Sequence, residues 1–454
     1  MTYKIFSKLS VVALYILLAA PVQHSLAQKN VKTLTLDEAV NLSVKSSAQL
    51  KIANAKVDEA IATYHEAWNN HLPDVKVSGS FMRLNNPNVN MKVRLGGSDT
   101  SKSAVSAIKV TQATYGNVSA SLPLFSGLRV KYGVESAKYL EQAAKLDADN
   151  DKEAVIMNTV LAFSNLYKAS RSVVIVRENL KQQQQRVADF SNLEKNGLLA
   201  RNDLLKAQLQ QSNIELSLLD AENDLKMTFV NMDLMLGLPE DTELIPDTTG
   251  FHIQTDIGSV IQWEQTALQN RKDISSLSFR EKAATSNIKA TKGEYFPGLA
   301  LTGGLIAADV PGLLTITNAL NIGIGLQYNL GALWKTEAKV AAANAYLHQV
   351  QYSQSILSDQ IKSEINKSYY DYLLTLKKIE VYVKAVEQAD ENYRITKNKY
   401  DNSLATTTDL LEADVAQLQA KLNHTLAQAE ALVMYKKLQQ TAGIISNYFL
   451  STTK

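Results

Sequence analysis

The chain contains one twelve-residue stretch in two versions. The first reads Asn196-Gly197-Leu198-Leu199-Ala200-Arg201-Asn202-Asp203-Leu204-Leu205-Lys206-Ala207, and the second reads Asn402-Ser403-Leu404-Ala405-Thr406-Thr407-Thr408-Asp409-Leu410-Leu411-Glu412-Ala413. Corresponding residues lie 206 positions apart, since 402 minus 196 is 206. Each version has the composition of a turn between two amphipathic helices. A recurrence at this spacing indicates a duplicated unit whose two helical hairpins end in similar tips.

The composition is that of a folded protein rich in long helices. Hydrophobic residues make up 45% of the 454 residues, and glycine and proline are scarce at 19 and 8. Few helix-breaking residues permit long uninterrupted helices. The net charge of +2 comes from 47 basic and 45 acidic residues that are thoroughly mixed. The chain therefore lacks the basic stripe that nucleic-acid binding needs.

Nothing in the sequence has the pattern of a catalytic, cofactor or metal site. The absence of cysteine excludes disulfides, thiolate metal sites, cysteine nucleophiles and a lipid-modified N-terminal cysteine. The six histidines are scattered without metal-ligand spacing. The glycines form neither a phosphate loop nor a dinucleotide fingerprint. We therefore expect a protein that is not an enzyme, with no cofactor and no metal.

Residues 1–27 have the pattern of a secretory signal peptide. Lys4 and Lys8 precede an apolar run from Leu9 to Ala20, and Ser25-Leu26-Ala27 is a small-x-small cleavage site. The alternative, a membrane anchor, is disfavoured because an apolar run of about a dozen residues is too short to span a bilayer as a helix. No later stretch is apolar for long enough either, so entry into a membrane would require strands.

Each repeat begins with a helix and continues with two strands. Helical periodicity runs from Leu36 to about Asn70, where Thr35 and Glu38 suggest a capping box, and again from about Ser259 to Glu294. These helices match at a shift of 224, which is 297 minus 73 for the prolines that follow them. Period-two alternation then predicts strands at about 74–84 and 114–125, and at about 297–308 and 318–331. In the last strand, one face carries Leu320, Ile322, Ile324 and Leu326.

The loops between the paired strands differ in length. The shifts of 224 and 206 differ by 18, so the first hairpin holds 18 extra residues. They fall where Asn85-Asn86-Pro87-Asn88 and Gly96-Gly97-Ser98 indicate a long polar loop. The second loop, around Asp309-Val310-Pro311-Gly312, is shorter. Because insertions collect at exposed tips, we expect both loops to face solvent at the same end.

A very long helix and a hairpin tip complete each repeat. Long helices are predicted at about 128–195 and 334–401, each roughly 100 Å long if straight. They end at tips 196–203 and 402–409. After the tips, leucine-rich positions recur at three- and four-residue steps and predict a coiled-coil seam; they are Leu205, Leu209, Ser212, Leu216 and Leu219, matched by Leu411, Val415, Leu418, Leu422 and Thr425. The predicted organisation is a signal peptide (1–27), a first repeat (28–249) and a second repeat (250–454).

Acidic residues in the tips allow two interpretations. Asp203 and Asp409 are expected in the first turn of the following helix. Glu412, three residues after Asp409, also falls there if the first turn is counted to include it. Acids at this position complement the helix dipole, which contributes about 0.3–1 kcal/mol each. The other interpretation is a charged constriction formed where the tips converge on an axis. The residues alone favour the dipole interpretation.

The duplicated order of elements resembles the TolC-type outer-membrane efflux protein family, also called outer membrane factors. The resemblance rests on the order helix, two strands, very long helix, Gly-Leu-x(5)-Asp-Leu-Leu-x-Ala turn and helix, given twice behind a signal peptide. It implies a mixed α and membrane β fold in which a homotrimer forms a 12-stranded outer-membrane β-barrel and a long periplasmic α-helical coiled-coil tunnel. Four strands cannot close a membrane barrel, for which about eight is the minimum. Two copies would give eight strands and three would give twelve, and the family favours three.

The resemblance also implies a function and its residues. It suggests a passive exit duct in the outer membrane that contacts lipid, a periplasmic adaptor (membrane fusion) protein and, through it, an inner-membrane pump. The gate and contact residues carried over are Asp409 and Glu412 as an acidic constriction, Asp203 and Tyr400 as contacts between hairpins, and Leu198 and Leu404 as adaptor contacts. Three copies of the acids around an axis would attract cations.

The second tip departs from the family pattern at two positions. Ala405 stands where the family has an arginine of its closing salt bridge, and Ser403 replaces the usual tip glycine. Asn402 is then the expected left-handed residue.

One alternative and one ambiguity remain from the sequence. A soluble periplasmic coiled-coil scaffold or adaptor is the alternative, but such a protein should have one helical hairpin flanked by compact β domains. Drug efflux by a tripartite pump and type I protein secretion both remain open, because a shared duct takes its specificity from its pump.

Overall fold

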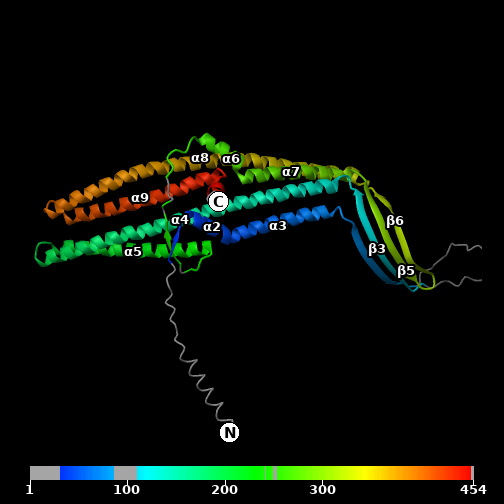
Figure 1. Ribbon diagram of the computed structural model, residues 1–454, viewed down its shortest axis with the longest axis horizontal. Helices are drawn as coiled ribbons and strands as arrows, with labels where there is room; N and C mark the ends of the chain where they lie inside the picture. The colour runs from blue at the N-terminus through cyan, green and yellow to red at the C-terminus, as the bar shows by residue number, and fades with distance from the viewer. Residues whose placement is uncertain (1–30, 86–109, 241, 248, 250–252, 451–454) are drawn as a thin grey trace, which may run out of the picture. The chain divides into compact units, whose positions relative to one another are not determined.

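The computed structural model describes residues 31–85, 110–240, 242–247, 249 and 253–450 (Figure 1). The predicted signal peptide and most of the predicted polar loop lie outside these residues. The chain forms two compact units. The first unit contains residues up to Ser46, Thr159–Ile253 and Lys377–Val433, and the second contains Ser47–Asn158, Gln254–Leu376 and residues from Met434 onward.

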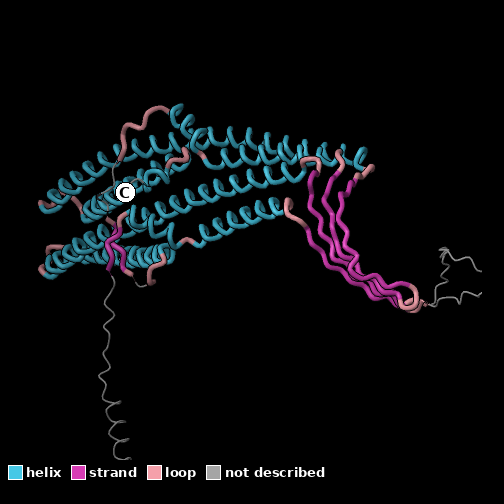
Figure 2. The backbone as a smooth tube through the Cα atoms, turned by 45° about the vertical axis from the view of Figure 1, so that its right-hand side comes forward, coloured by secondary structure: helices cyan, strands magenta, loops and turns pink. Residues whose placement is uncertain are grey.

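The second unit contains a four-stranded antiparallel sheet, drawn in magenta in Figure 2. Its order is β2 (Asp74–Arg83), β3 (Gln112–Phe125), β5 (Gly298–Val310) and β6 (Leu314–Gln327). Strand β6 ends at Gln327, so its predicted continuation to residue 331 is wrong. The chain turns there instead, because the Asn329 side chain accepts a hydrogen bond from Gly331 N at 3.1 Å and its carbonyl accepts one from Ala332 N at 2.9 Å.

The register places an apolar row that crosses all four strands on one face. Val77 pairs with Val118, Val118 with Leu305, and Leu305 with Leu320. The neighbouring row on the opposite face contains Lys76, Ser119, Gly304 and Asn321. Because side chains alternate between faces along a strand, the sheet has one apolar and one polar surface.

Each predicted first helix is two helices in the structure. The first pair is α2 (Leu36–Ser46) and α3 (Ala48–Asn69), and the second is α6 (Val260–Asn270) and α7 (Lys272–Lys292). The breaks at Ser47 and Arg271 are repeat-equivalent, since 271 minus 47 is 224. Ser47 restarts its helix by accepting a hydrogen bond from Leu50 N at 3.3 Å. No proline or glycine marks either break, so periodicity alone did not reveal them.

Only half of the predicted capping box at the start of α2 is formed. Glu38 N donates to Thr35 Oγ1 at 3.2 Å, as expected. The Glu38 carboxylate instead forms an ion pair with Lys32 at 2.8 Å. The opposite charge of Lys32 draws the carboxylate away from the capping position.

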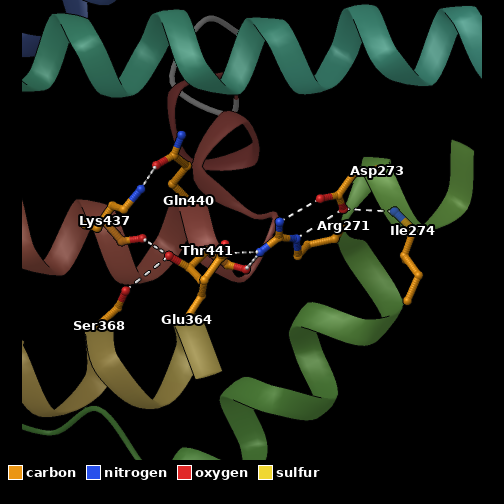
Figure 3. A network of polar contacts seen from close by, with 8 residues as sticks. All are labelled: Arg271, Asp273, Ile274, Glu364, Ser368, Lys437, Gln440 and Thr441. Atoms are coloured by element: carbon orange, nitrogen blue, oxygen red, sulfur yellow. Dashed lines mark hydrogen bonds and ion pairs between the residues drawn. The ribbon is translucent and has the colours of Figure 1, made fainter. Parts of the chain in front are cut away.

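Arg271 ties the start of α7 to two other helices (Figure 3). Its guanidinium donates to Asp273 Oδ2 at 2.6 Å, to Glu364 Oε2 of α8 (Ala332–Asp401) at 2.6 Å, and to the Thr441 carbonyl of α9 (Thr407–Thr441) at 3.4 Å. After α9, Gly443 has a left-handed φ of 71°, and a Cβ there would lie 2.8 Å from Arg271 N. Glycine therefore permits the close approach of this backbone to the helix break.

The first unit contains the two hairpin tips and a short parallel pair of strands. Helices α4 (Arg129–Lys195) and α5 (Arg201–Leu236) flank the first turn, and α8 and α9 flank the second. Strands β1 (Val31–Leu34) and β4 (Glu243–Pro246) pair in parallel and were not predicted. Their buried Leu34 and Leu244 join Phe163 and Leu166 of α4 in one hydrophobic cluster.

The predicted leucine seam on α5 is not buried within the chain. Leu205, Leu209, Leu216 and Leu219 are between 50% and 64% exposed. The buried face of α5 instead includes Leu204, Ala207 and Ile214, which contact clusters that contain residues of α4. Helix α5 has apolar residues at three- and four-residue steps on each of two faces. The spacing alone therefore could not show which of the two faces is buried against α4.

The remaining described elements are the short helices η1 (Gly293–Tyr295) and α10 (Ile445–Leu450). Among the helices in the described ranges, none combines the length and the apolar character needed to cross a membrane.

Candidate functional site

The two tips have the same backbone turn. In the first, Leu198 N donates to the Leu193 carbonyl at 2.9 Å, and in the second, Leu404 N donates to the Lys399 carbonyl at 2.8 Å. The left-handed residues are Gly197, with φ of 71°, and Ser403, with φ of 62°. The expectation that Asn402 takes this conformation is therefore wrong. The duplicated turn needs its left-handed residue at the same position in both copies, whichever side chain stands there.

Asp409 caps the helix that follows the second tip. Its Oδ2 accepts hydrogen bonds from Thr406 N and Thr406 Oγ1, both at 2.8 Å, and Asp409 N donates to Thr406 Oγ1 at 3.1 Å. These bonds to the backbone and hydroxyl of Thr406 lower the pKa of Asp409. Such a reciprocal capping box satisfies backbone donors at the helix start. The first tip has no side-chain cap, because Ala200 occupies the corresponding position.

Glu412 lies on the exposed surface of α9, three residues beyond Asp409. Within the described part of the chain, its carboxylate makes no hydrogen bond or ion pair. Local helix structure therefore accounts for Asp409 but leaves Glu412 without a structural role.

Lys206 connects the first tip to the second and lies beside Asp203 of its own helix. Lys206 Nζ lies 3.5 Å from Asp203 Oδ1 and donates to Thr408 Oγ1 of the second tip at 3.2 Å. Sequence reasoning assigned no role to Lys206. Its cation stands in the same cleft as Ala405, so this chain supplies a positive charge to the region from the other hairpin.

Tyr400 packs between the two hairpins. Its ring stacks on Phe190 with centroids 5.5 Å apart, within a cluster that includes Leu204 and Leu410. Burial raises the pKa of Tyr400, and the charge of Asp203 raises it further, whereas a hydrogen bond with Thr407 opposes the shift. The aromatic stack therefore holds the tips together beside the Asp203 carboxylate.

A cleft of about 780 Å³ lies between the tips and brings several predicted residues together. Leu198, Asp203, Tyr400 and Ala405 all line it, whereas Asp409, Glu412 and Leu404 do not. Leu198 and Leu404 are 75% and 77% exposed at the two turns. The structure thus separates the predicted residues into a cleft between the hairpins, an outward acid on α9 and exposed leucines at the turns.

Sequence reasoning missed a buried polar network close to the tips. Arg186 and Asp414 are only 8% and 1% exposed, and Arg186 Nη1 lies 3.1 Å from Asp414 Oδ2. Arg186 also donates to Tyr393 Oη at 2.8 Å and to Gln183 Oε1 at 2.6 Å. Gln183 in turn donates to the Ala207 carbonyl at 3.1 Å. The network therefore joins α4, α5, α8 and α9.

Repeat arithmetic could not have revealed the ion pair. Subtracting 206 from Asp414 gives Gln208, and adding 206 to Arg186 gives Asn392, so neither charge has a charged counterpart. The available signal was Asp414 beside Ala413 and one turn after Leu410, on the apolar face of the helix. A buried acid at such a position needs a partner.

No metal centre is present in the described ranges: they contain no group of three or more His, Cys, Asp or Glu side chains that could hold a metal ion.

The fold is shared with solved outer-membrane channels. The chain matches the outer-membrane channel OprN with a TM-score of 0.73 and 19% identity, over 90% of this chain and 89% of that one. It matches the Campylobacter jejuni CmeC outer membrane channel with a TM-score of 0.75 and 17% identity, over 90% and 86%. It matches the outer membrane protein VceC from Vibrio cholerae with a TM-score of 0.72 and 16% identity, over 90% and 96%. The helical and strand parts together therefore form the fold of these channels.

Curated relatives and a family model identify the class. The toxin and drug export protein A of Aggregatibacter actinomycetemcomitans is 23% identical over 439 residues, which is 88% of this chain and 86% of the relative. The alkaline protease secretion protein AprF of Pseudomonas aeruginosa is 21% identical over 255 residues, 54% of this chain and 52% of the relative. The model of the outer membrane efflux protein family matches residues 39–238 and 263–443.

The chain belongs to the outer membrane efflux protein family. The resemblance inferred from the duplicated tips is confirmed, and so is the expected location in the outer membrane. Members of this family are transport proteins, which favours the channel over the scaffold alternative.

Proposed function

We propose that three copies of this chain form an outer-membrane channel that serves as the passive exit duct of an efflux pump or a type I secretion system. The observation that carries the proposal is the sheet, which is open and has one apolar face. The row Val77, Val118, Leu305 and Leu320 lies exposed on that face. Lipid is the natural cover for it, and the polar face then borders a water-filled lumen.

The edges of the sheet require further strands. Strands β2 and β6 are the outer strands, and each has one edge unpaired within the sheet. Unpaired backbone groups are not tolerated in hydrocarbon, so each β2 must pair with β6 of a neighbouring copy. Strands of 10 to 14 residues are long enough to cross the membrane at a tilt. Three copies give twelve strands, enough to enclose a conducting lumen.

The helical part supports the same assembly. The exposed seam of α5, which includes Leu205, Leu209 and Leu216, is too apolar to remain in water along a helix of 36 residues. In a trimer it packs against the helices of a neighbouring copy. The two tips of each copy, one from the first repeat at 28–249 and one from the second at 250–454, then form the periplasmic end of the tunnel.

The gate is proposed at the tips. Glu412 has no local structural role, so three copies of it around the axis form the acidic constriction, and Asp409 contributes charge while it caps α9. Asp203 and Tyr400 hold the two hairpins of one copy together in the closed state. Leu198 and Leu404 present apolar side chains to a periplasmic adaptor, which connects the channel to an inner-membrane pump.

The relatives suggest two classes of cargo. One relative is named for export of toxin and drugs, and another for secretion of an alkaline protease. Both functions use a duct without its own energy source.

Cysteine crosslinking tests the assembly directly, because the natural chain contains no cysteine. A cysteine at Val77 of β2 is combined in turn with one at Leu320, Ile322 or Ile324 of β6. The proposal expects at least one pair to give covalent dimers and trimers on oxidation in the outer membrane, and nothing larger. Each single-cysteine variant is the matched control. Absence of trimers in every pair, or a larger ladder, would overturn the proposal.

Planar-bilayer conductance tests the constriction. Glu412→Gln should reduce the preference for potassium over chloride, because three charges leave the narrowest point. Asp359→Asn, which removes an exposed acid of α8 that lies 43 residues before the second tip begins at residue 402, is the control and should change nothing. An unchanged selectivity in Glu412→Gln would remove Glu412 from the gate, even if the trimer forms.

A further inference from the structure

The helix-linked ends of all four strands lie at one end of the sheet. Asp74, the first residue of β2, pairs with Ser121 near the end of β3, and Gly298, the first residue of β5, pairs with Gln327, the last of β6. Helices α3, α4, α7 and α8 therefore all meet the sheet at this end, as Figure 2 shows. This junction is where a membrane-spanning sheet leaves the lipid.

Among the large apolar side chains exposed at the junction are four that form repeat-equivalent pairs, and we call these four the apolar collar. They are Leu72, Leu128, Phe296 and Trp334, and each is 46–66% exposed. They form repeat-equivalent pairs, because 296 minus 72 is 224 and 334 minus 128 is 206. Exposed aromatic residues at this level are typical of the boundary between hydrocarbon and headgroups.

A cation follows the collar in each repeat. Arg129 comes directly after Leu128, and Lys335 comes directly after Trp334, again 206 residues apart. Both side chains are exposed, and neither forms an ion pair with a described residue. Arg129 donates only its Nε, to the Ser126 carbonyl at 3.0 Å, which leaves both Nη groups available. The nearby Glu294 is already paired with Lys339 at 2.6 Å.

Helix stability does not account for these cations. Arg129 and Lys335 lie in the first turns of α4 and α8, and neither first turn contains an acid. A positive side chain there is unfavourable with the helix dipole. The two cations are therefore free to bind a negative partner from outside the described chain.

A small cleft beside Arg129 has room for such a partner. It has a volume of about 260 Å³ and is lined by residues at the end of α3 and directly after it, just before α4, and in the first turns of α4, among them Asn70, Ser126, Arg129 and Gly133. Because Gly133 has no side chain and nothing lies within 4 Å of the position of its Cβ, the approach remains open.

We propose that Arg129 and Lys335 bind the phosphate groups of anionic phospholipids in the periplasmic leaflet of the outer membrane, while the apolar collar contacts the upper acyl chains. The proposal rests on the membrane channel proposed above. Guanidinium and ammonium groups match phosphate in charge, and arginine can bind it in a bidentate manner. Each cation near an anionic membrane surface strengthens attachment by roughly fivefold. In a trimer, six such cations fix the depth of the channel in the membrane.

Native mass spectrometry of the detergent-solubilised full-length protein tests the proposal. Phosphatidylglycerol and the zwitterionic phosphatidylcholine are titrated separately, and bound lipids are counted on the trimer. The wild-type protein should prefer phosphatidylglycerol. Arg129→Gln with Lys335→Gln should weaken phosphatidylglycerol binding by about tenfold or more and leave phosphatidylcholine unchanged. Lys362→Gln, which removes an exposed cation 27 residues beyond Lys335 on α8, is the matched control and should have no effect.

Two further arms separate the causes. Gly133→Leu fills the cleft without changing charge and should weaken phosphatidylglycerol binding, whereas millimolar inorganic phosphate should not displace the lipid. The lipid site is overturned if the intact wild-type trimer shows no preference for phosphatidylglycerol. It is also overturned if the double variant prefers phosphatidylglycerol as strongly as the wild type does. Displacement by inorganic phosphate also overturns it, in favour of a soluble anion. Loss of the trimer in the wild-type protein instead indicates failure of the channel proposal.

Discussion

Breaking the buried ion pair between Arg186 and Asp414 should loosen the hairpin tips. Asp414→Leu leaves the Arg186 guanidinium buried without a carboxylate, and loss of one partner of a buried pair costs about 3–5 kcal/mol. Arg186 keeps its bonds to Tyr393 at 2.8 Å and Gln183 at 2.6 Å, so the lower end of this range is expected. About 3 kcal/mol corresponds to roughly a hundredfold increase in local opening, at 1.4 kcal/mol per factor of ten.

Hydrogen exchange read out by mass spectrometry measures this opening. Peptides covering residues 180–190 and 408–418 should exchange about a hundredfold faster in Asp414→Leu, whereas peptides from the sheet should not change. If the tips form the gate, the same variant should also raise the open fraction of the channel in planar bilayers.

Two controls separate the buried pair from charge loss in general. The double variant Arg186→Met with Asp414→Leu should recover most of the protection, because apolar replacement of a whole buried pair is close to neutral. Glu222→Gln breaks the exposed pair with Arg177 and should cost at most about 1 kcal/mol. If Asp414→Leu exchanges no faster than Glu222→Gln, the buried pair does not hold the tips.

Three further predictions concern pH, strain and the sheet. Burial raises the pKa of Glu153 to about 7, against an opposing hydrogen bond from Ser446. The stability that the neutral Glu153 carboxyl contributes is therefore fully present below pH 4.5, its ordinary pKa, and is lost as the pH rises through 7. Glu153→Gln should raise the free energy of unfolding at pH 8 by up to about 3 kcal/mol, and by much less at pH 5, as thermal melts at the two pH values will show. An equal gain at both pH values would contradict this assignment. Ser403→Gly should stabilise the second turn by about 0.5–1 kcal/mol in thermal melts, because glycine relieves the left-handed strain; a lowered melting temperature would refute this. Leu320→Arg should cost about 2–4 kcal/mol on the lipid face, whereas Asn321→Arg should be tolerated on the polar face. Heat stability of the oligomer distinguishes the two, and similar losses would reverse the assignment of the faces.

The sequence was informative wherever structure follows from local periodicity. Strict alternation over Leu320–Leu326 placed the strand, and the absence of proline and glycine marked the long helices. The spacing of 206 identified the start of both turns, at residues 196 and 402, directly after α4 and α8. The same spacing aligns Ser403 with Gly197, but the chemistry of the side chains favoured Asn402 as the left-handed residue, and that expectation was wrong. These features depend on neighbours along the chain, so a single sequence contains them.

Other features were settled only by packing between distant segments. Two apolar faces on α5 obey the same spacing, and contact with α4 selected Leu204 and Ala207 rather than Leu205 and Leu209 for burial. The breaks at Ser47 and Arg271 have no breaker residue, and at Arg271 the side chain is held by partners on other helices.

The acids of the second tip show the same division. Their presence and spacing were evident from the sequence, but their roles were not. Asp409 caps its own helix, Asp414 forms a buried ion pair with Arg186 of another helix, and Glu412 remains exposed. By itself the sequence determined a duplicated helix and strand architecture with charged tips, because periodicity and repetition are local properties. Only the tertiary structure decided which charge is structural and which is available, since a charge is neutralised by partners that folding brings from far along the chain.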